Sequence, residues 1–256
     1  MGKIVFLDID GTILDSNNEI PDSTREAVRL LREKGVYVAI ATGRSPHMFK
    51  DIREALAIDT YVAFNGQMVV VDGKPIYQYK IPSSVLEKMI ERSTLRGHSL
   101  AFMAKDRLVV NKENDHRIAL AMGSLNIPYP PCIPDFYLGE VISQVLLFSE
   151  DGEESVYAED FPGFRFVRWH PFACDMVVKD GSKATGIKKA IAALGFSIDD
   201  TYAFGDGLND MEMLKTVGTG VAMGNGHPTL KKVADLVTAS VDENGLYEGV
   251  KKLGLI

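Results

Sequence analysis

Two carboxylates, Asp8 and Asp10, stand two residues apart in the segment Asp8–Thr12, directly after the apolar run Ile4–Leu7. A buried strand over that run would deliver both side chains into one turn. Two acids packed there without a cation would repel each other, and the pKa of one of them would rise. Mg²⁺ would relieve the repulsion, because it takes hard oxygen ligands from carboxylates and from substrate phosphate. The simpler alternative for this segment, taken alone, is a capping turn without chemistry.

A calcium-binding EF-hand loop is a second alternative, because Glu19 lies eleven residues after Asp8. Ile13 nevertheless occupies the sixth position, where such a loop needs glycine. A strand rather than a helix is also expected before the loop, so the pattern does not fit an EF-hand.

A second acidic turn, Gly205–Asp210, follows the apolar segment Thr201–Phe204. Asp206 and Asp210 could add carboxylate ligands to a metal site. The amide of Asn209 could form a neutral hydrogen bond with phosphate. The alternative is that Asn209 or Asp210 only caps a helix.

Two further segments carry groups suited to phosphate. Thr42–Arg44 ends an apolar run and offers a hydroxyl, backbone N–H groups and, at Gly43, room for close approach of a ligand. A strand-ending turn is the simpler interpretation of this segment alone. Lys183 starts a predicted helix, where the helix dipole disfavours a cation, so a phosphate-binding role is as strong an interpretation as a structural one. Its surroundings do not match a P-loop.

The elements that must position these groups alternate between strands and helices. Apolar runs predict strands at 3–7, 36–41 and 61–64, with helical patterns between them at 24–34 and 46–56. The alternation returns from a helix at 183–194 onward. This order is typical of parallel βαβ units, so we expect an α/β fold with a Rossmann-like parallel sheet and helices on both faces. The four polar segments would then meet at one edge of the sheet, where they suit phosphoryl transfer.

The alternation of strands and helices is interrupted between the third predicted strand and the helix at 183–194. Residues 83–180 mix hairpin and helix patterns, which predicts an inserted α+β domain. We therefore expect a core domain formed by residues 1–82 and 181–256. The segment Glu150–Asp160 of the insertion carries six acids and no base, which favours a solvated helix face.

The composition excludes several classes of protein. A net charge of −7, from 28 Lys and Arg against 35 Asp and Glu, argues against a broad surface for nucleic acid. No apolar run approaches the roughly 18–20 residues of a membrane-spanning helix. The two cysteines, Cys132 and Cys174, do not form a disulfide framework, so we expect a cytoplasmic protein.

Together the polar segments closely resemble the haloacid dehalogenase superfamily, and within it the Cof-type phosphatases. The resemblance rests on the order and spacing of Asp8-Ile-Asp-Gly-Thr12, Ala41-Thr-Gly-Arg44, Lys183 and Gly205-Asp-Gly-Leu-Asn-Asp210, and Gly220–Asn225 is similar to the end of the family pattern. It extends over the whole chain, including an insertion of suitable size after the third strand. The segment before Lys183 lacks the proline of many members, which leaves the second domain boundary open.

This resemblance implies a role for each site residue. Asp8 would be the nucleophile and would form an aspartyl-phosphate. Asp10 would protonate the leaving alcohol and then activate water. The Mg²⁺ site would be formed by Asp8, the backbone carbonyl of Asp10 and Asp206, with support from Asp210. The phosphoryl group would be bound by Thr42, Gly43, Lys183, Asn209 and the backbone N–H of Ile9.

The resemblance also implies that the inserted domain is a cap, which closes over the site and determines specificity. Arg168, Trp169 and His170 are candidates within the cap to contact the leaving group, and Arg44 is a candidate in the core. A packed strand end with exposed neighbours is the simpler interpretation of the three cap residues.

We therefore expect a Mg²⁺-dependent phosphomonoester hydrolase that acts on small phosphorylated metabolites, with sugar phosphates as the first choice. A phosphomutase on the same scaffold is an alternative, although the cap offers no clear basic cluster for a second phosphate. A phospho-aspartate signalling module is an alternative of another class, and it would need neither an inserted cap nor an acid/base at Asp10. The sequence indicates no obligate protein partner, no nucleic acid and no membrane.

Overall fold

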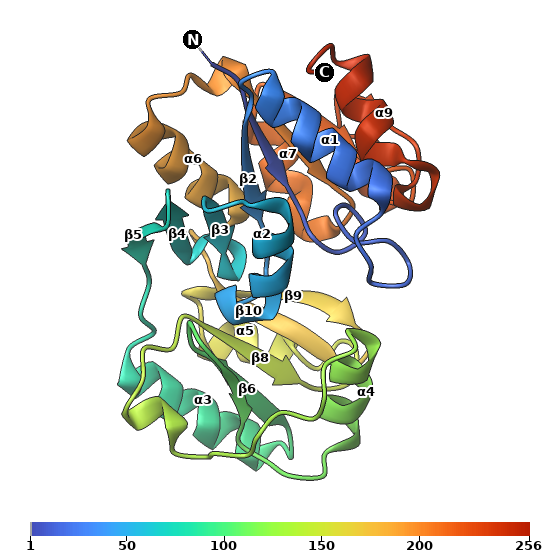
Figure 1. The fold of residues 1–256 in the computed structure, drawn as a ribbon. Helices are drawn as coiled ribbons and strands as arrows, with labels where there is room; N and C mark the ends of the chain where they lie inside the picture. Colours follow the sequence, from blue (N-terminus) through green and yellow to red (C-terminus); the bar gives the residue numbers. More distant parts are fainter. Residues whose placement is uncertain (1) are drawn as a thin grey trace. The chain divides into compact units, whose positions relative to one another are not determined.

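A computed structural model describes residues 2–256, and the chain divides into two compact units (Figure 1). The core unit contains the chain up to Arg44 together with Met48–Tyr77 and Ser182–Ile256. The inserted unit contains Ser45–His47 and Gln78–Gly181. No helix within residues 2–256 is long and apolar enough to cross a membrane.

The core unit is built on an eight-stranded sheet with the strand order β13-β12-β11-β1-β2-β3-β4-β5. Its strands are β1 (Ile4–Leu7), β2 (Tyr37–Ala41), β3 (Tyr61–Ala63), β4 (Met68–Val71), β5 (Lys74–Gln78), β11 (Thr201–Gly205), β12 (Thr219–Ala222) and β13 (Leu236–Val237). Neighbouring strands from β13 to β3 are parallel, and β4 is antiparallel to β3. The predicted Rossmann-like parallel sheet is therefore confirmed.

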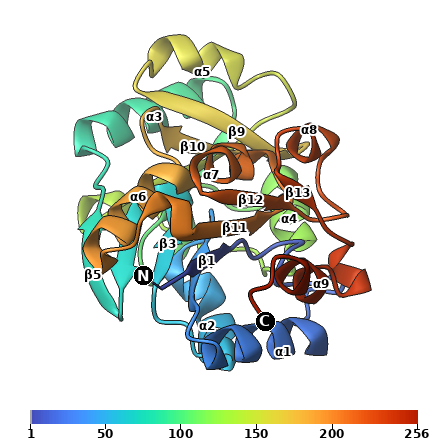
Figure 2. The ribbon, with the colours of Figure 1, turned by 90° about the horizontal axis from the view of Figure 1, so that it is seen from above.

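Helices cover both faces of this sheet, as the sequence predicts (Figure 2). One face carries α6 (Lys183–Leu194), α7 (Met211–Thr216) and α8 (Pro228–Lys231), and the other carries α1 (Asp22–Glu33), α2 (Lys50–Leu56) and α9 (Gly245–Lys252). Short 3-10 turns lie at Pro46–Phe49, Phe64–Gly66, Ile198–Asp200, Leu208–Asp210 and Val241–Glu243.

The central strand β1 positions the first acidic segment. All four of its residues are fully buried, because β1 lies between β11 and β2 and both sheet faces are covered. Buried strands of parallel sheets are apolar along their whole length for this reason. The chain leaves the sheet at Asp8, whose backbone N–H donates to the carbonyl of Phe204 on β11 at 3.0 Å. The ends of β1 and β11 therefore meet at the same edge.

The inserted unit has its own five-stranded sheet, in the order β7-β6-β8-β10-β9. Its strands pair antiparallel, which agrees with the predicted α+β character. The elements are α3 (Ser83–Leu95), β6 (Ser99–Met103), β7 (Leu108–Val110), α4 (His116–Ser124), a 3-10 turn (Phe136–Leu138), β8 (Gln144–Phe148), α5 (Ser155–Asp160), β9 (Phe164–His170) and β10 (Ala173–Val178).

The acidic segment of the insertion differs from its prediction as a solvated helix face. Only its last six residues, Ser155–Asp160, are helical. Glu153 lies 2.9 Å from Nε2 of His98, Glu154 pairs with Arg168, and Asp160 lies 3.6 Å and 3.3 Å from the guanidinium groups of Arg92 and Arg96. The prediction holds for Glu150, Asp151 and Glu159, which are exposed, and was wrong for the other three acids, because their partners come from other parts of the sequence.

The packing of α6 against β3 provides a test of the fold. Gly186 is buried on α6, and a Cβ there would lie 2.4 Å from Cγ1 of Val62 and 3.0 Å from Cα of Gly66. Alanine is the better helix former by about 1 kcal/mol. We nevertheless expect Gly186→Ala to lower the free energy of unfolding by about 1–3 kcal/mol, because the closely packed backbone has no room for a methyl group.

The matched control is Gly123 in α4, where a Cβ would meet no atom within 4 Å. Gly123→Ala should raise the free energy of unfolding by about 0.5–1 kcal/mol through helix propensity alone. Urea denaturation measures both changes. Equal effects of the two substitutions would contradict the close contact between α6 and β3.

Candidate active site

A buried ammonium lies at the centre of the site. Nζ of Lys183 is 2.6 Å from Oδ1 of Asp8 and 2.6 Å from Oδ1 of Asp210. The three side chains come from the start of α6, the end of β1 and the turn after β11, and all of them are buried. The fold thus brings together three residues that the sequence separates by up to 202 positions (210 − 8).

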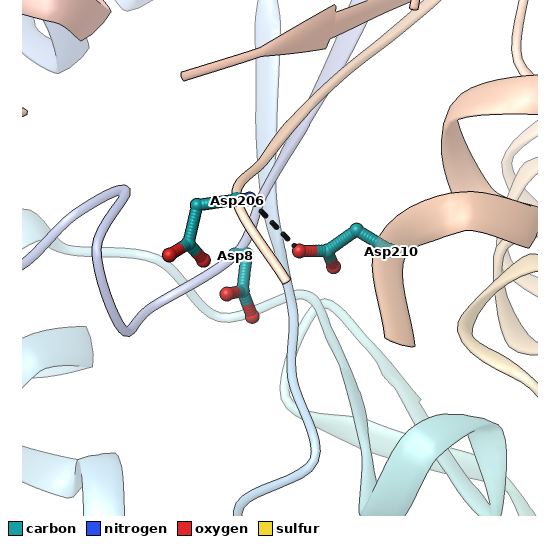
Figure 3. Close-up of side chains that lie close together, drawn as sticks. All are labelled: Asp8, Asp206 and Asp210. Atoms are coloured by element: carbon teal, nitrogen blue, oxygen red, sulfur yellow. Dashed lines mark hydrogen bonds between the residues drawn. The ribbon is translucent and has the colours of Figure 1, made fainter. Parts of the chain in front are cut away.

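A third carboxylate completes an acidic cluster (Figure 3). One carboxylate oxygen from each of Asp8, Asp206 and Asp210 lies within 4.8 Å of the others. The cluster is formed by the two acidic turns that follow neighbouring strands, β1 and β11. The structure therefore brings together three of the four residues predicted for the metal site.

The turn after β11 is shaped to hold Asp210 in place. Oδ2 of Asp210 accepts hydrogen bonds from the backbone N–H groups of Asp206, at 3.0 Å, and Gly207, at 2.9 Å. A Cβ on Gly205 would lie only 2.5 Å from the Asp210 carboxyl carbon, so glycine is required for this approach. One carboxylate oxygen of Asp210 thus fixes the turn, while the other binds Lys183.

Burial and charge shift the pKa values of the cluster. Burial raises the pKa of Asp8 well above its usual value, and Asp210 adds to the increase, while Lys183 opposes it. Burial and Asp210 likewise raise the pKa of Asp206 to about 7. Burial alone would lower the pKa of Lys183, but the two carboxylates outweigh burial and raise it.

These side chains fit a divalent cation. Three carboxylates face one ammonium, which leaves an excess of two negative charges when all three acids are ionised. Burial, together with the neighbouring carboxylates, raises the pKa values of Asp8 and Asp206, so ionising all three acids is costly without a cation. Carboxylate oxygens are the ligands that hard divalent cations prefer. Asp8, Asp206 and Asp210 could therefore hold such a cation.

Asp10 is not one of these three carboxylates, and its side chain pairs with Arg44. Nε of Arg44 donates to one carboxylate oxygen of Asp10 at 3.1 Å, and Nη2 donates to the other at 2.5 Å. This two-point geometry fixes the orientation of the carboxylate as well as its place. The side chain of Asp10 is still 45% exposed, so it remains accessible to a ligand. The sequence predicts Arg44 as a specificity residue, but it does not reveal this pair.

The segment after β2 lies against the turn after β3. Thr42 is buried, and its hydroxyl accepts from the backbone N–H of Arg44 at 3.1 Å. A Cβ on Gly43 would lie 3.0 Å from Nδ2 of Asn65. Oδ1 of Asn65 in turn accepts from Nδ2 of Asn209 at 3.4 Å. Asn65 was not among the predicted site residues, and its only signal was its place at the end of a strand.

The turn after β1 is compact. The carbonyl of Ile9 accepts three backbone hydrogen bonds of this turn, from Thr12 at 3.3 Å and from Ile13 and Leu14 at 2.9 Å each. Gly11 has a φ of +67°, and a Cβ there would lie 2.4 Å from Oδ2 of Asp206. Nδ2 of Asn225 donates to the carbonyl of Gly11 at 2.8 Å, which gives this residue of the Gly220–Asn225 segment a structural role.

The three residues predicted for specificity in the insertion lie at the end of β9. Nε of Arg168 donates to Glu154 at 3.0 Å, and the guanidinium also donates to backbone carbonyls, among them that of Pro171 at 3.0 Å. Arg168 therefore holds a loop of its own unit. The rings of Trp169 and His170 lie 5.9 Å apart. A role of these residues in specificity stays a prediction.

Comparison with known proteins relates the whole chain to one family. Residues 5–250 match the family of haloacid dehalogenase-like hydrolases. A protein of Bacillus subtilis (strain 168), YkrA, which carries the name of a phosphatase, is 46% identical over 254 residues. That alignment covers 99% of this chain and 98% of the relative.

Solved structures share the fold along its full length. BT1666 from Bacteroides thetaiotaomicron, a phosphatase of the haloacid dehalogenase superfamily, has a TM-score of 0.92 at 30% identity over 100% of this chain and 96% of that chain. The sugar phosphatase BT4131, of subclass IIB, has a TM-score of 0.89 at 30% identity over 99% of this chain and 100% of that chain. This chain therefore belongs to the haloacid dehalogenase superfamily, as a phosphatase of the Cof type.

Proposed function

We propose that the protein is a Mg²⁺-dependent hydrolase that removes phosphate from small phosphorylated metabolites, with sugar phosphates as the first choice. The observation that carries the proposal is the position of Asp8. Its carboxylate lies at the end of the central strand, against one ammonium and two further carboxylates. A likeness at 30% identity to a sugar phosphatase supports the substrate class.

Asp8 is the nucleophile in this proposal. A carboxylate oxygen of Asp8 attacks phosphorus, the bond from phosphorus to the leaving oxygen breaks, and an aspartyl-phosphate forms. Asp10 gives its proton to the leaving oxygen, which departs as the alcohol. Asp10 then takes a proton from the water that attacks the aspartyl-phosphate, and this step releases inorganic phosphate and regenerates Asp8.

The remaining side chains stabilise charge. Asp8, Asp206 and the backbone carbonyl of Asp10 would hold Mg²⁺ with support from Asp210, and the ion would neutralise charge on the phosphoryl group. Lys183 lies against Asp8 and offers a positive charge to the same group. Four further donors would bind phosphate oxygens, namely Thr42, Gly43, Asn209 and the backbone N–H of Ile9.

The inserted domain, residues 83–180, is proposed to select the leaving group, while residues 1–82 and 181–256 carry the chemistry. Trp169 and His170 are its best candidates for contact with a sugar, because Arg168 already binds Glu154. The partner in the cell is then a small phosphorylated metabolite, and we propose a cytoplasmic location.

The two carboxylates of the first motif can be separated by their kinetics. We expect Asp8→Asn to lower kcat by about 10⁴-fold or more, because no other group can form the covalent intermediate. Asp10→Asn should lower kcat on a sugar phosphate by about 10²–10⁴-fold. Its effect on p-nitrophenyl phosphate should be smaller, because that leaving group departs without a proton. Phosphate release in the presence of Mg²⁺ measures both changes.

The exposed Asp51 on α2 offers a control, and Asp51→Asn should leave both rates unchanged. Wild-type rates in the Asp8→Asn variant would contradict the covalent mechanism. Stable phosphorylation of the wild-type protein by acetyl phosphate, without turnover of any ester, would instead favour a signalling module.

Arg44 is expected to act through Asp10. Arg44→Lys keeps the positive charge but loses the two-point contact, so Asp10 is held less firmly. We expect kcat on a sugar phosphate to fall by about 10-fold, with a smaller loss on p-nitrophenyl phosphate. Arg29→Lys on the exposed face of α1 is the control. Equal losses on the two substrates would show that Arg44 binds the phosphoryl group itself.

Mg²⁺ should stabilise the protein in a pH-dependent way. Without metal, the folded Asp206 holds its proton up to about pH 7, whereas the unfolded residue loses it near its usual pKa of 3.8. The free energy of unfolding of the metal-free protein should therefore fall as pH rises from about 4 to about 7. At about pH 7.5, Mg²⁺ at about 100 times its Kd should raise the Tm by about 5 °C.

At about pH 5 the increase in Tm should be clearly smaller, because protons compete with the cation for Asp8 and Asp206. Thermal denaturation with EDTA or MgCl₂ measures the difference. Asp206→Asn should remove most of the effect at the higher pH. An increase in Tm that is independent of pH would place the cation elsewhere.

A further inference from the structure

The turn after β3, Phe64–Gly66, has an unusual backbone. Three consecutive residues have a positive φ, namely 52° at Phe64, 50° at Asn65 and 94° at Gly66. Glycine adopts this region freely and asparagine tolerates it, but an aromatic residue rarely does. Backbone strain of this kind persists only where surrounding contacts hold it, and it gathers at functional sites.

The backbone of this turn is bonded to the segment after β2. The N–H of Asn65 donates to the carbonyl of Thr42 at 3.0 Å, and the N–H of Phe64 donates to the carbonyl of Arg44 at 3.2 Å. The N–H of Thr42 donates in return to the carbonyl of Val62 on β3 at 2.9 Å. These hydrogen bonds hold the turn and the segment Thr42–Arg44 against each other, so a change in the backbone of one would disturb the other.

The same turn lies against the start of α6. A Cβ on Gly66 would lie 2.0 Å from the carbonyl oxygen of Ser182, so the two backbones are in direct contact. Ser182 is the N-cap of α6, and its side chain accepts from the N–H of Thr185. Lys183 is the next residue. The turn thus also helps to place the helix start that carries the buried ammonium.

The side chain of Asn65 lies between two groups proposed to bind phosphate. It is 3% exposed, its Oδ1 accepts from Nδ2 of Asn209 at 3.4 Å, and its Nδ2 lies 3.0 Å from where a Cβ on Gly43 would be. Gly43 and Asn209 come from the ends of two strands, β2 and β11, which are not neighbours in the sheet. Asn65, which follows a third strand, β3, contacts both residues and so connects the two strand ends.

We propose that Asn65 is a positioning residue for phosphoryl binding. Its carboxamide orients the Asn209 side chain and holds the backbone at Gly43, so that both donate to the same phosphoryl group. This inference rests on the proposed function of the site. In the left-handed turn the Asn65 side chain lies close to both groups.

Two substitutions test this role. Asn65→Gly retains the left-handed backbone and removes the carboxamide. Asn65→Asp retains the size of the side chain and its acceptor for Asn209, but places a negative charge beside the phosphate. We expect the Ki of inorganic phosphate and the KM of p-nitrophenyl phosphate to rise by about 10-fold in Asn65→Gly, the effect of one lost polar contact. The increase should be larger in Asn65→Asp.

Asn126→Gly is the matched control, because Asn126 also has a positive φ, of 56°, but lies in an exposed turn after α4. Its KM and phosphate Ki should equal those of the wild type. Isothermal titration with inorganic phosphate in the presence of Mg²⁺ gives the affinity independently of turnover, and thermal denaturation reports on folding.

Wild-type KM and phosphate affinity in both Asn65 variants would overturn the proposal, whatever their Tm. So would the failure of both variants to fold, because the role would then be structural. A wild-type protein that neither hydrolyses esters nor binds phosphate would overturn the proposed function, and the role of Asn65 with it. An active wild-type protein with unchanged variants would overturn the role of Asn65 alone.

Discussion

The core of this protein depends on a lysine that is buried as a cation. The side chain of Lys183 is 0% exposed, and its ammonium lies 2.6 Å from the carboxylates of Asp8 and Asp210. A buried charge is tolerated only when it is paired, so the fold has to bring both acids to it. This requires β1 and β11 to end at the same edge and α6 to approach β3 closely, as Gly186 permits.

One ammonium does not neutralise the acids around it, and this imbalance suits the site to its chemistry. Asp206 adds a third carboxylate, so the cluster attracts a cation and would repel an anionic substrate without one. Asp10 has a different environment, because its carboxylate pairs with the guanidinium of Arg44. In the proposed mechanism, carboxylates of one type acquire separate tasks from their surroundings, as in other enzymes that divide the roles of nucleophile and acid between two carboxyl groups.

Much of this arrangement could be predicted from the sequence. An apolar run followed by acids locates a strand end, and parallel strands bring such ends together, so Asp8, Asp206 and Asp210 were predicted to meet. The pair of Arg44 with Asp10 was missed, because a side-chain contact depends on rotamers and on the course of two turns. The contacts of Glu153 and Glu154 were missed for a related reason, since their partners are 55 (153 − 98) and 14 (168 − 154) residues away.

The turn at Phe64–Gly66 shows where such prediction has to fail. Local preference gives an aromatic residue a negative φ, whereas the structure gives Phe64 a φ of 52°. Nothing in the neighbouring sequence demands this value; the hydrogen bonds to Thr42 and Arg44 and the contact with Ser182 do. A strained φ of this kind persists where the contacts that it permits stabilise the structure by more than the strain costs. Here those contacts hold the ends of β2 and β3 and the start of α6 together.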